Sequence, residues 1–263
     1  MEGIIGVMPM SVRQSFDNFI TQKLISLGFK TTNIPQDTSE KLILFSRTHR
    51  RQEYCKRPRT IHIARNFVCP DAYRTRFNSV IRVLKTGGTD IVNYLSTGIL
   101  TNDRDDAMLN HDGIYHFHLI PPPRRNDDIG NKMVFAYLDE NDAYILGIYT
   151  HEDFVFSFDK LRTMYSNWPE LFSSRESNSE TGLTETMVRN VRSKNGNIME
   201  YLLDNMWVSF RKFSGTVGRG DNVLDIMYAD QVMNRINCLE SQAQRTFGVE
   251  EITMEFDCFE RFL

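Results

Sequence analysis

Three segments in the middle of the chain read as β-strands, and the connections between them limit how they can pair. These segments are residues 112–120, 132–138 and 143–149. Residues 121–130 include three consecutive prolines, which cannot lie in a central strand. Asp139–Asp142 has the composition of a four-residue hairpin turn. The sequence therefore predicts an antiparallel meander.

Apolar residues recur at helical spacing on both sides of this meander. In Ser11–Leu27 they predict a helix that Ser11 or Ser15 caps and Gly28 ends. Residues 41–46 fit either a strand or a short helix. Further helices are expected at residues 72–84, 158–168, 185–192 and 223–242, and further strands at 59–64, 199–203, 206–213 and 251–257. We therefore predict an α+β fold, in which helices flank a central antiparallel sheet and the N-terminal region is helical and basic.

The composition along the chain indicates four successive segments. Residues 1–110 form a mainly helical basic region, and residues 111–172 hold the sheet, a histidine cluster and a helix. Residues 173–184 are the most polar stretch and are expected to be a linker, followed by an α/β region at residues 185–263. All four could equally belong to one domain, since 263 residues suit one large domain or two smaller ones.

Three of the six histidines fall on or beside the predicted sheet. His116 and His118 are two residues apart in a strand and therefore share one face of it. His151 follows the third strand. Imidazoles titrate near neutral pH and bind metals, so this set is the first candidate for chemistry. Each histidine could instead be a hydrogen-bonded structural residue on a polar sheet face.

Two kinds of chemistry suit three clustered histidines. They could supply a general acid and a general base, while the nearby Arg124, Arg125 and Lys132 hold a phosphate. Alternatively, three imidazoles with water in the fourth position form a zinc site. The first chemistry needs no cofactor, whereas the second needs zinc.

A strongly basic stretch is the second candidate site. Residues 41–85 contain twelve Lys or Arg and two acidic residues, although the net charge of the chain is -3. The densest part predicts a phosphate-binding patch, made of Arg47, Arg50, Arg51, Lys56, Arg57 and Arg59. The stretch could also be a solvated segment that balances acidic surface elsewhere.

The sequence gives few signs of export or membrane insertion. No apolar run reaches the roughly 20 residues of a transmembrane helix, and the first residues lack the basic start and apolar length of a signal peptide. The four cysteines have no CxxC spacing and are too sparse for a disulfide scaffold. We therefore expect a cytoplasmic protein without a membrane partner.

Several short motifs resemble, in their order, those of a family of uncharacterised bacterial proteins. The shared features are a GIHHLHL-like strand at Gly113–Leu119, an LLFA-like strand at Met133–Tyr137, a following histidine at His151 and an NWPE-like end at Asn167–Glu170. The resemblance covers most of the chain. No established activity is known for that family, so the resemblance implies an architecture more than a function.

A shorter stretch resembles RelE/HigB-like ribonuclease toxins. Residues 144–154 are similar to the last strand of those toxins and the segment after it, and the match covers about residues 112–160. Such toxins are small and cut RNA without metal, using basic and histidine side chains. Phe154 stands where they carry tyrosine, so the resemblance implies no tyrosine hydroxyl there.

These observations predict a metal-independent endoribonuclease, a toxin or phage-defence effector that binds RNA. His116, His118 and His151 would share the acid–base work, and the basic stretch would grip the RNA backbone. An inhibitory protein partner is a further expectation. The alternatives are a zinc-dependent hydrolase that uses the same histidines and a non-catalytic nucleic-acid or protein-binding module.

Overall fold

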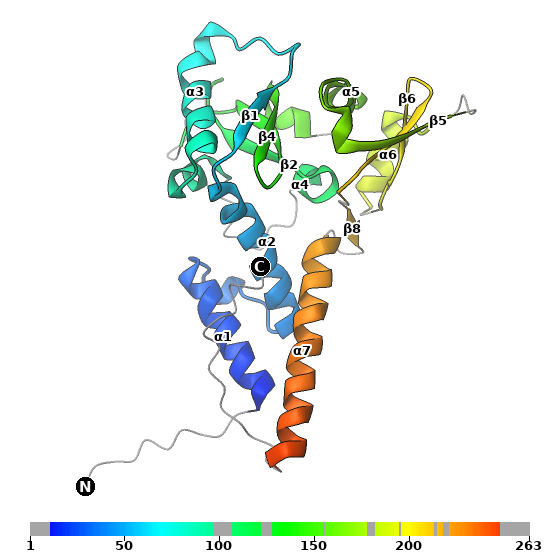
Figure 1. Cartoon of the computed structure of the whole chain (residues 1–263). Helices are drawn as coiled ribbons and strands as arrows, with labels where there is room; N and C mark the ends of the chain where they lie inside the picture. Colours follow the sequence, from blue (N-terminus) through cyan, green and yellow to red (C-terminus); the bar gives the residue numbers. More distant parts are fainter. Residues whose placement is uncertain are drawn as a thin grey trace. The chain divides into compact units, whose positions relative to one another are not determined.

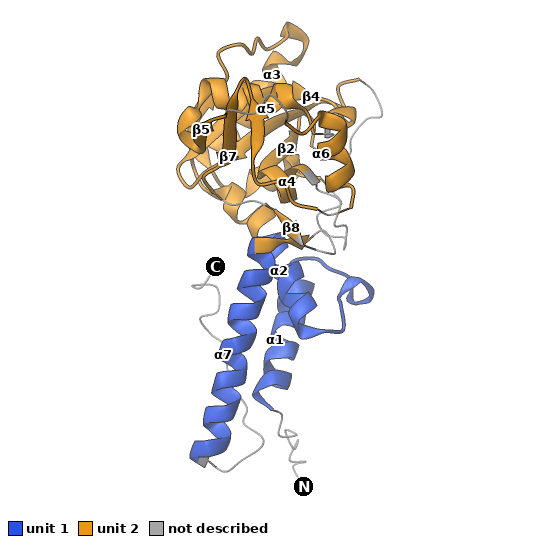
Figure 2. Cartoon of the chain, turned by 90° about the vertical axis from the view of Figure 1, so that its right-hand side faces the viewer, with its two compact units in different colours: residues 1–49, 100–102, 224–263 blue, residues 50–99, 103–223 orange. Residues whose placement is uncertain are grey.

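Figure 1 shows the computed structural model of the chain, which describes residues 11–96, 107–121, 128–154, 156–177, 182–194, 196–212, 215–217 and 221–247. The chain divides into two compact units, coloured separately in Figure 2. The first unit holds residues 1–49, 100–102 and 224–263, and the second holds residues 50–99 and 103–223. The predicted segments 1–110 and 185–263 are therefore each shared between the two units.

The first unit is helical. It contains α1 (Val12–Ser26), the 3₁₀ turn η1 (Thr31–Asn33), most of α2 (Thr38–Gln52) and most of α7 (Val223–Phe247). Ser11 caps α1 by accepting a hydrogen bond from the backbone N–H of Gln14. Gly28 follows the helix with a φ of 97°, a conformation that glycine adopts readily.

The core of the first unit decides the ambiguous residues 41–46. They form part of α2, and Leu42 and Phe45 are buried with Phe16 and Ile20 of α1 and Ile236 of α7. A spacing of three residues brings both α2 side chains to the same side of a helix. The helical reading was therefore the correct one.

The second unit contains the sheet and most of the remaining elements. In chain order they are η2 (Tyr54–Lys56), β1 (Thr60–Ile63), α3 (Asp71–Thr86), η3 (Thr89–Tyr94), α4 (Ala107–Asp112), β2 (Ile114–His118), β3 (Met133–Leu138), β4 (Asp142–Tyr149), η5 (His151–Phe154), α5 (Phe158–Asn167), η6 (Pro169–Leu171), β5 (Phe172–Glu176), α6 (Glu185–Arg192), β6 (Tyr201–Leu203), β7 (Met206–Phe210), β8 (Thr216–Val217) and β9 (Asp221–Asn222). Helices and strands together confirm the α+β class. The strand expected at residues 251–257 lies outside the described residues.

The main sheet has the strand order β1-β4-β3-β2. β2, β3 and β4 pair antiparallel, as the meander predicted, but β1 pairs parallel with β4. The sheet is therefore mixed rather than antiparallel. A parallel neighbour needs a long crossover, and the chain supplies one, because α3, α4 and two other strands lie between β1 and β4 in the sequence.

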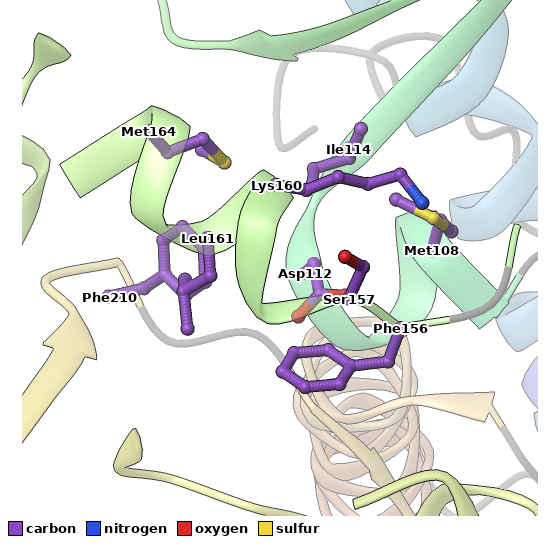
Figure 3. A pocket seen from close by; sticks show the side chains of 9 residues that line it. All are labelled: Met108, Asp112, Ile114, Phe156, Ser157, Lys160, Leu161, Met164 and Phe210. Carbon is purple, nitrogen blue, oxygen red and sulfur yellow. The ribbon is translucent and has the colours of Figure 1, made fainter. Parts of the chain in front are cut away.

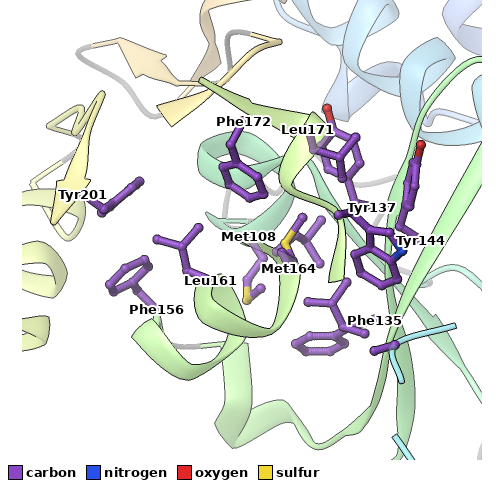
Figure 4. Packing of buried hydrophobic residues seen from close by; sticks show 14 of the residues in the cluster. Met108, Phe135, Tyr137, Tyr144, Phe156, Leu161, Met164, Leu171, Phe172 and Tyr201 are labelled. Atoms are coloured by element: carbon purple, nitrogen blue, oxygen red, sulfur yellow. The ribbon is translucent and has the colours of Figure 1, made fainter. Parts of the chain in front are cut away.

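Both faces of this sheet are buried. α3 packs on one face through Phe77, Val80 and Leu84. α5 packs on the opposite face through Leu161 and Met164, in the cluster of buried side chains that Figure 4 shows. The sheet is therefore the middle layer of the second unit, with α3 against one face and α5 against the other.

A second sheet, of order β5-β7-β6, contributes to the cluster on the α5 side. Residues 173–176, which we expected in a linker, form most of β5. Only Phe172 of this strand is buried, and the other four residues are exposed. Polar composition here reflects a strand at the surface, which composition alone does not distinguish from a linker.

In the ranges that the structure describes, no helix has both the length and the apolar character needed to span a bilayer.

Candidate active site

The second unit brings His116, His118 and His151 together. The ring centroids of His118 and His151 are 5.4 Å apart, and those of His116 and His118 are 6.1 Å apart. His118 therefore lies beside both other rings. We call these three residues the histidine cluster.

The sheet register explains how the cluster forms. β2 places both of its histidines on one face, and His118 pairs with Met133 of β3. Met133 in turn pairs with Tyr149, the last residue of β4. His151 follows two residues later in η5. The ends of β2 and β4 therefore lie at the same end of the sheet, and the turn after β4 carries His151 to His118.

The three histidines differ in their access to solvent. His118 is only 3% exposed, His116 is half-buried and His151 is exposed. Solvent therefore reaches His151 directly and His116 in part. His118 lies in the interior, beside both other rings.

Asp153 organises the turn that carries His151. Its carboxylate accepts hydrogen bonds from the backbone N–H and the hydroxyl of Thr150, at 2.8 and 2.9 Å. Its backbone carbonyl accepts a hydrogen bond from the Lys160 ammonium. These bonds fix the backbone on both sides of His151.

Lys160 of α5 is a residue that sequence reasoning missed. The side chain is buried, and Nζ lies 5.8 and 5.4 Å from the ring centroids of Phe135 and Tyr149. Burial lowers the pKa of this amine. Lys160 shares the buried stripe of α5 with Leu161 and Met164. A lysine on an otherwise apolar helix stripe is the sequence signal that could have revealed it.

A small pocket adjoins Lys160, which extends into it from α5 (Figure 3). Asp112, Ser157 and Lys160 are its polar members, and the rest of the lining is apolar: Met108, Ile114, Phe156, Leu161, Met164 and Phe210. Ile114 and His116 are two residues apart in β2 and share a face. The pocket and the histidine cluster therefore lie on the same side of the sheet.

Asp112 also belongs to a buried ion pair. Nη1 and Nη2 of Arg192 each donate to one of its carboxylate oxygens at 2.6 Å. The side chain of Asp112 is 6% exposed and that of Arg192 is 10% exposed. Arg192 also donates to the Tyr201 hydroxyl and lies 4.4 Å from the ring centroid of Phe156. Burial opposes the charge of Arg192, but the nearby Asp112 carboxylate outweighs this effect and raises the pKa. The pair joins the ends of α4 and α6.

His111, next to this ion pair, is a buried histidine with a lowered pKa. It is buried, and its burial, together with the charge of Arg192, lowers its pKa to about 4. His111 is therefore neutral at pH 7. It was not among the predicted site residues.

The structure does not gather the residues predicted to hold a phosphate. Lys132 lies 3.3 Å from an oxygen of Asp128, and its Nζ is 5.8 Å from the ring centroid of Tyr73 of α3. It therefore reaches the α3 side of the sheet, opposite to the histidine cluster. Arg124 and Arg125 lie outside the described residues.

Half of the predicted nucleic-acid patch is buried. Arg47, Arg51 and Arg59 are 3%, 6% and 3% exposed. Arg59 donates to the backbone carbonyls of Tyr54, Arg57 and Asp139 at 2.6, 2.8 and 2.8 Å. It ties the start of β1 to the turn between β3 and β4. A guanidinium used in this way cannot also present its charge to a phosphate.

The other three members of the patch are nearer to solvent. Arg50 is half-buried and donates to Asn110 at 3.4 Å, and Lys56 forms an ion pair with Glu53. Arg57 is exposed, with its guanidinium 5.3 Å from the ring centroid of Tyr54. Of the six predicted residues, Arg57 is the best placed to meet a ligand.

The zinc alternative lacks a formed ligand set in the described part of the chain. Among these residues, no group of three or more His, Cys, Asp or Glu side chains is arranged to hold a metal ion. A three-histidine zinc site therefore stays a prediction.

Comparisons of the chain with protein-family models, with curated proteins and with solved structures found no match. The two resemblances noted in the sequence therefore remain predictions.

Proposed function

We propose that this protein is a metal-independent endoribonuclease whose histidine cluster performs general acid–base catalysis. The observation that supports it best is the convergence of His116, His118 and His151. RNA cleavage at a phosphodiester needs one group to accept a proton and another to donate one. Imidazoles perform both tasks near neutral pH.

The proposed reaction is a transfer of the phosphoryl group within the RNA. One imidazole takes the proton from a 2′-hydroxyl, whose oxygen then bonds to the adjacent phosphorus. The bond from phosphorus to the 5′-oxygen breaks, and a protonated imidazole gives its proton to that oxygen. The products are a 2′,3′-cyclic phosphate and a free 5′-hydroxyl.

The exposures suggest how the histidines divide this work. His151 and His116 are accessible enough to meet the substrate, and the buried His118 lies beside both. His118 would orient the two outer rings and restore their protonation states after each turnover. Lys160 acts as a positioning residue, because it binds the carbonyl of Asp153 in the turn that carries His151.

The test is cleavage of a fluorescent single-stranded RNA of mixed sequence, with and without EDTA. We expect cleavage that survives EDTA and falls about 10²–10⁴-fold in His151→Ala and in His118→Gln. His62→Gln is the matched control, because His62 is a partly exposed histidine of the same sheet that pairs with Asp142 instead. It should cleave at the unsubstituted rate.

A second substrate tests the chemistry itself. An oligonucleotide of the same sequence with 2′-deoxyribose throughout should resist cleavage, since it lacks the attacking hydroxyl. Equal cleavage of both substrates, or full activity in both cluster variants, would refute the proposal. Activity that is lost in EDTA and restored by zinc would refute the metal-independent mechanism and support the zinc-dependent hydrolase.

The cellular role follows as part of the proposal. A toxin or defence effector with this activity should slow growth when it is expressed in bacteria, and His151→Ala should relieve the effect at equal protein level. Co-purification with a protein that restores growth would identify the inhibitory partner.

A further inference from the structure

One strip of surface in the second unit is strongly basic, and the cleavage mechanism does not use it. Arg74, Asn78, Arg82 and Lys85 are all exposed on α3. At about 100° per residue they fall within roughly 80° of the helix circumference. The buried residues Phe77, Val80, Val83 and Leu84 lie on the other side of the helix.

The strip continues beyond α3 to Arg57. The backbone N–H of Arg59 donates to the carbonyl of Leu84, and that of Gly88 donates to the carbonyl of Lys56. A Cβ on Gly87 would lie 2.5 Å from the Lys56 carbonyl oxygen. The backbone around Arg57 therefore crosses the end of α3 at close range, which places Arg57 at the Lys85 end of the strip. We call Arg57, Arg74, Arg82 and Lys85 the α3 basic strip.

The positive charge of the strip is largely uncompensated. Between Asp71 and Asp90 the sequence contains no acidic residue. Asp71 pairs with Arg74, but within the described residues neither Arg82 nor Lys85 has an ion-pair partner. Cations at the end of a helix complement its dipole, which accounts for Lys85. The helix dipole does not account for Arg74, which lies in the first half of α3, or for Arg57, which lies outside the helix.

We propose that the α3 basic strip binds the phosphate backbone of single-stranded RNA and is the main electrostatic grip on the substrate. This inference rests on the proposed function for the identity of the ligand. Exposed arginines that alternate with polar residues suit a polyanion, and the strip is about 16 Å long from Arg74 to Lys85. It takes the role predicted for residues 47–59, half of whose basic side chains are buried.

The position of the strip gives it a specific consequence. α3 covers one face of the sheet and the histidine cluster lies on the other. An RNA strand that touches both must pass around the sheet, so only a substrate several nucleotides long can use the strip. A dinucleotide that fills the cluster alone should gain nothing from it.

The first experiment measures binding of a fluorescent 20-nucleotide RNA to the full chain by anisotropy at several salt concentrations. The variant is Arg57→Gln/Arg82→Gln/Lys85→Gln. At 100 mM salt we expect it to bind about tenfold more weakly or worse. We expect the slope of log affinity against log salt to fall by about 2, since each phosphate contact contributes about 0.7 for single strands.

A matched variant controls for net charge. Arg13→Gln/Lys30→Gln/Lys194→Gln also removes three exposed positive charges, but from other elements. It should retain the affinity and the salt slope of the unsubstituted protein. Far-ultraviolet circular dichroism of both variants checks that the fold is intact.

The second experiment separates the strip from the catalytic cluster. The strip variant should cleave a dinucleotide with unchanged kcat/KM and the 20-nucleotide RNA with about tenfold lower kcat/KM. If the protein cleaves no RNA but the strip variant loses binding, the grip stands and the nuclease proposal fails. If cleavage occurs but the strip variant and the control bind alike, the grip is refuted and the nuclease proposal stands. Binding to vesicles of acidic phospholipid that depends on the strip, without binding to RNA, would also refute the proposal that the strip binds RNA.

Discussion

The two faces of β2 show how one strand serves two purposes. Tyr115 and Phe117 point to the α3 side, where both are buried in an apolar cluster. Ile114, His116 and His118 point to the α5 side, where Ile114 is buried but the strand ends in two histidines. The first face holds the fold together, whereas the second combines core packing with titratable groups. The comparison shows that the face that carries the histidines is also part of the layer that packs the core.

Substitution of neighbouring residues in β2 gives the sharpest test of this difference. Phe117→Ala should lower the free energy of unfolding by about 3–5 kcal/mol, because Phe117 is fully buried. RNA cleavage per folded molecule should not change. His116→Ala should cost less than about 1.5 kcal/mol, as for most point substitutions outside the core, and should lower kcat about 10²-fold or more. Urea unfolding and single-turnover cleavage measure the two effects, and the opposite pattern would contradict the difference between the two faces of β2.

The ion pair on the α5 side is expected to be nearly as important for stability. Arg192→Met leaves the Asp112 carboxylate buried without its partner and should cost about 3–5 kcal/mol. The double variant Asp112→Leu/Arg192→Met removes both charges and should recover part of this loss in the same urea experiment. Equal stability of the single and double variants would show that an unpaired Asp112 carboxylate costs nothing at this position, which would contradict the prediction.

The free energy of unfolding should also depend on pH, through His111 beside the Asp112–Arg192 pair. The pKa of His111 is lowered to about 4 in the folded protein, so between pH 6.5 and 4 the unfolded chain binds a proton that the folded chain does not. Stability must therefore fall as the pH drops through this window, by up to about 3 kcal/mol. His111→Gln should flatten the decline between pH 7 and pH 4, measured by urea unfolding at each pH. An unchanged pH dependence would exclude His111 as its source.

Lys160→Met should have a small effect on stability, below about 1.5 kcal/mol, because the side chains are similar in volume and Lys160 packs against two aromatic rings. It removes the bond to the Asp153 carbonyl and should loosen the turn that carries His151. We expect kcat for RNA cleavage to fall about 10–100-fold, with little change in RNA affinity. Lys194→Met, at an exposed position, is the control. A parallel loss of affinity and kcat would argue against a purely positioning role.

Much of the sheet was predictable from local pattern. The three strands of the meander and the turn at Asp139–Asp142 occur close to where alternation and turn composition placed them. The parallel pairing of β1 with β4 was not predictable, because alternation marks a strand but not its neighbour. β5 was missed for a related reason, since four of its five residues are exposed and read as a polar linker.

The site was predictable only in part. The spacing of His116 and His118 places them on one face of any strand, and the position of His151 after β4 made its approach plausible. The Asp112–Arg192 pair was missed because its two residues lie 80 positions apart in the sequence. Lys160 was missed although it stands on an apolar helix stripe, because its contacts with the rings of β3 and β4 are not visible in the sequence. The basic stretch was identified, but the sequence could not distinguish exposed arginines from buried ones such as Arg59.

By itself, the sequence determined which residues alternate, which face each strand side chain takes and where turns occur, because these depend on neighbours along the chain. Three features depend on the folded chain: His151 lies beside His118, Lys160 lies over two aromatic rings, and the Arg59 guanidinium donates hydrogen bonds to backbone carbonyls. Burial and charge pairing depend on contacts between segments that are distant in the sequence, so the local pattern around a residue does not predict them.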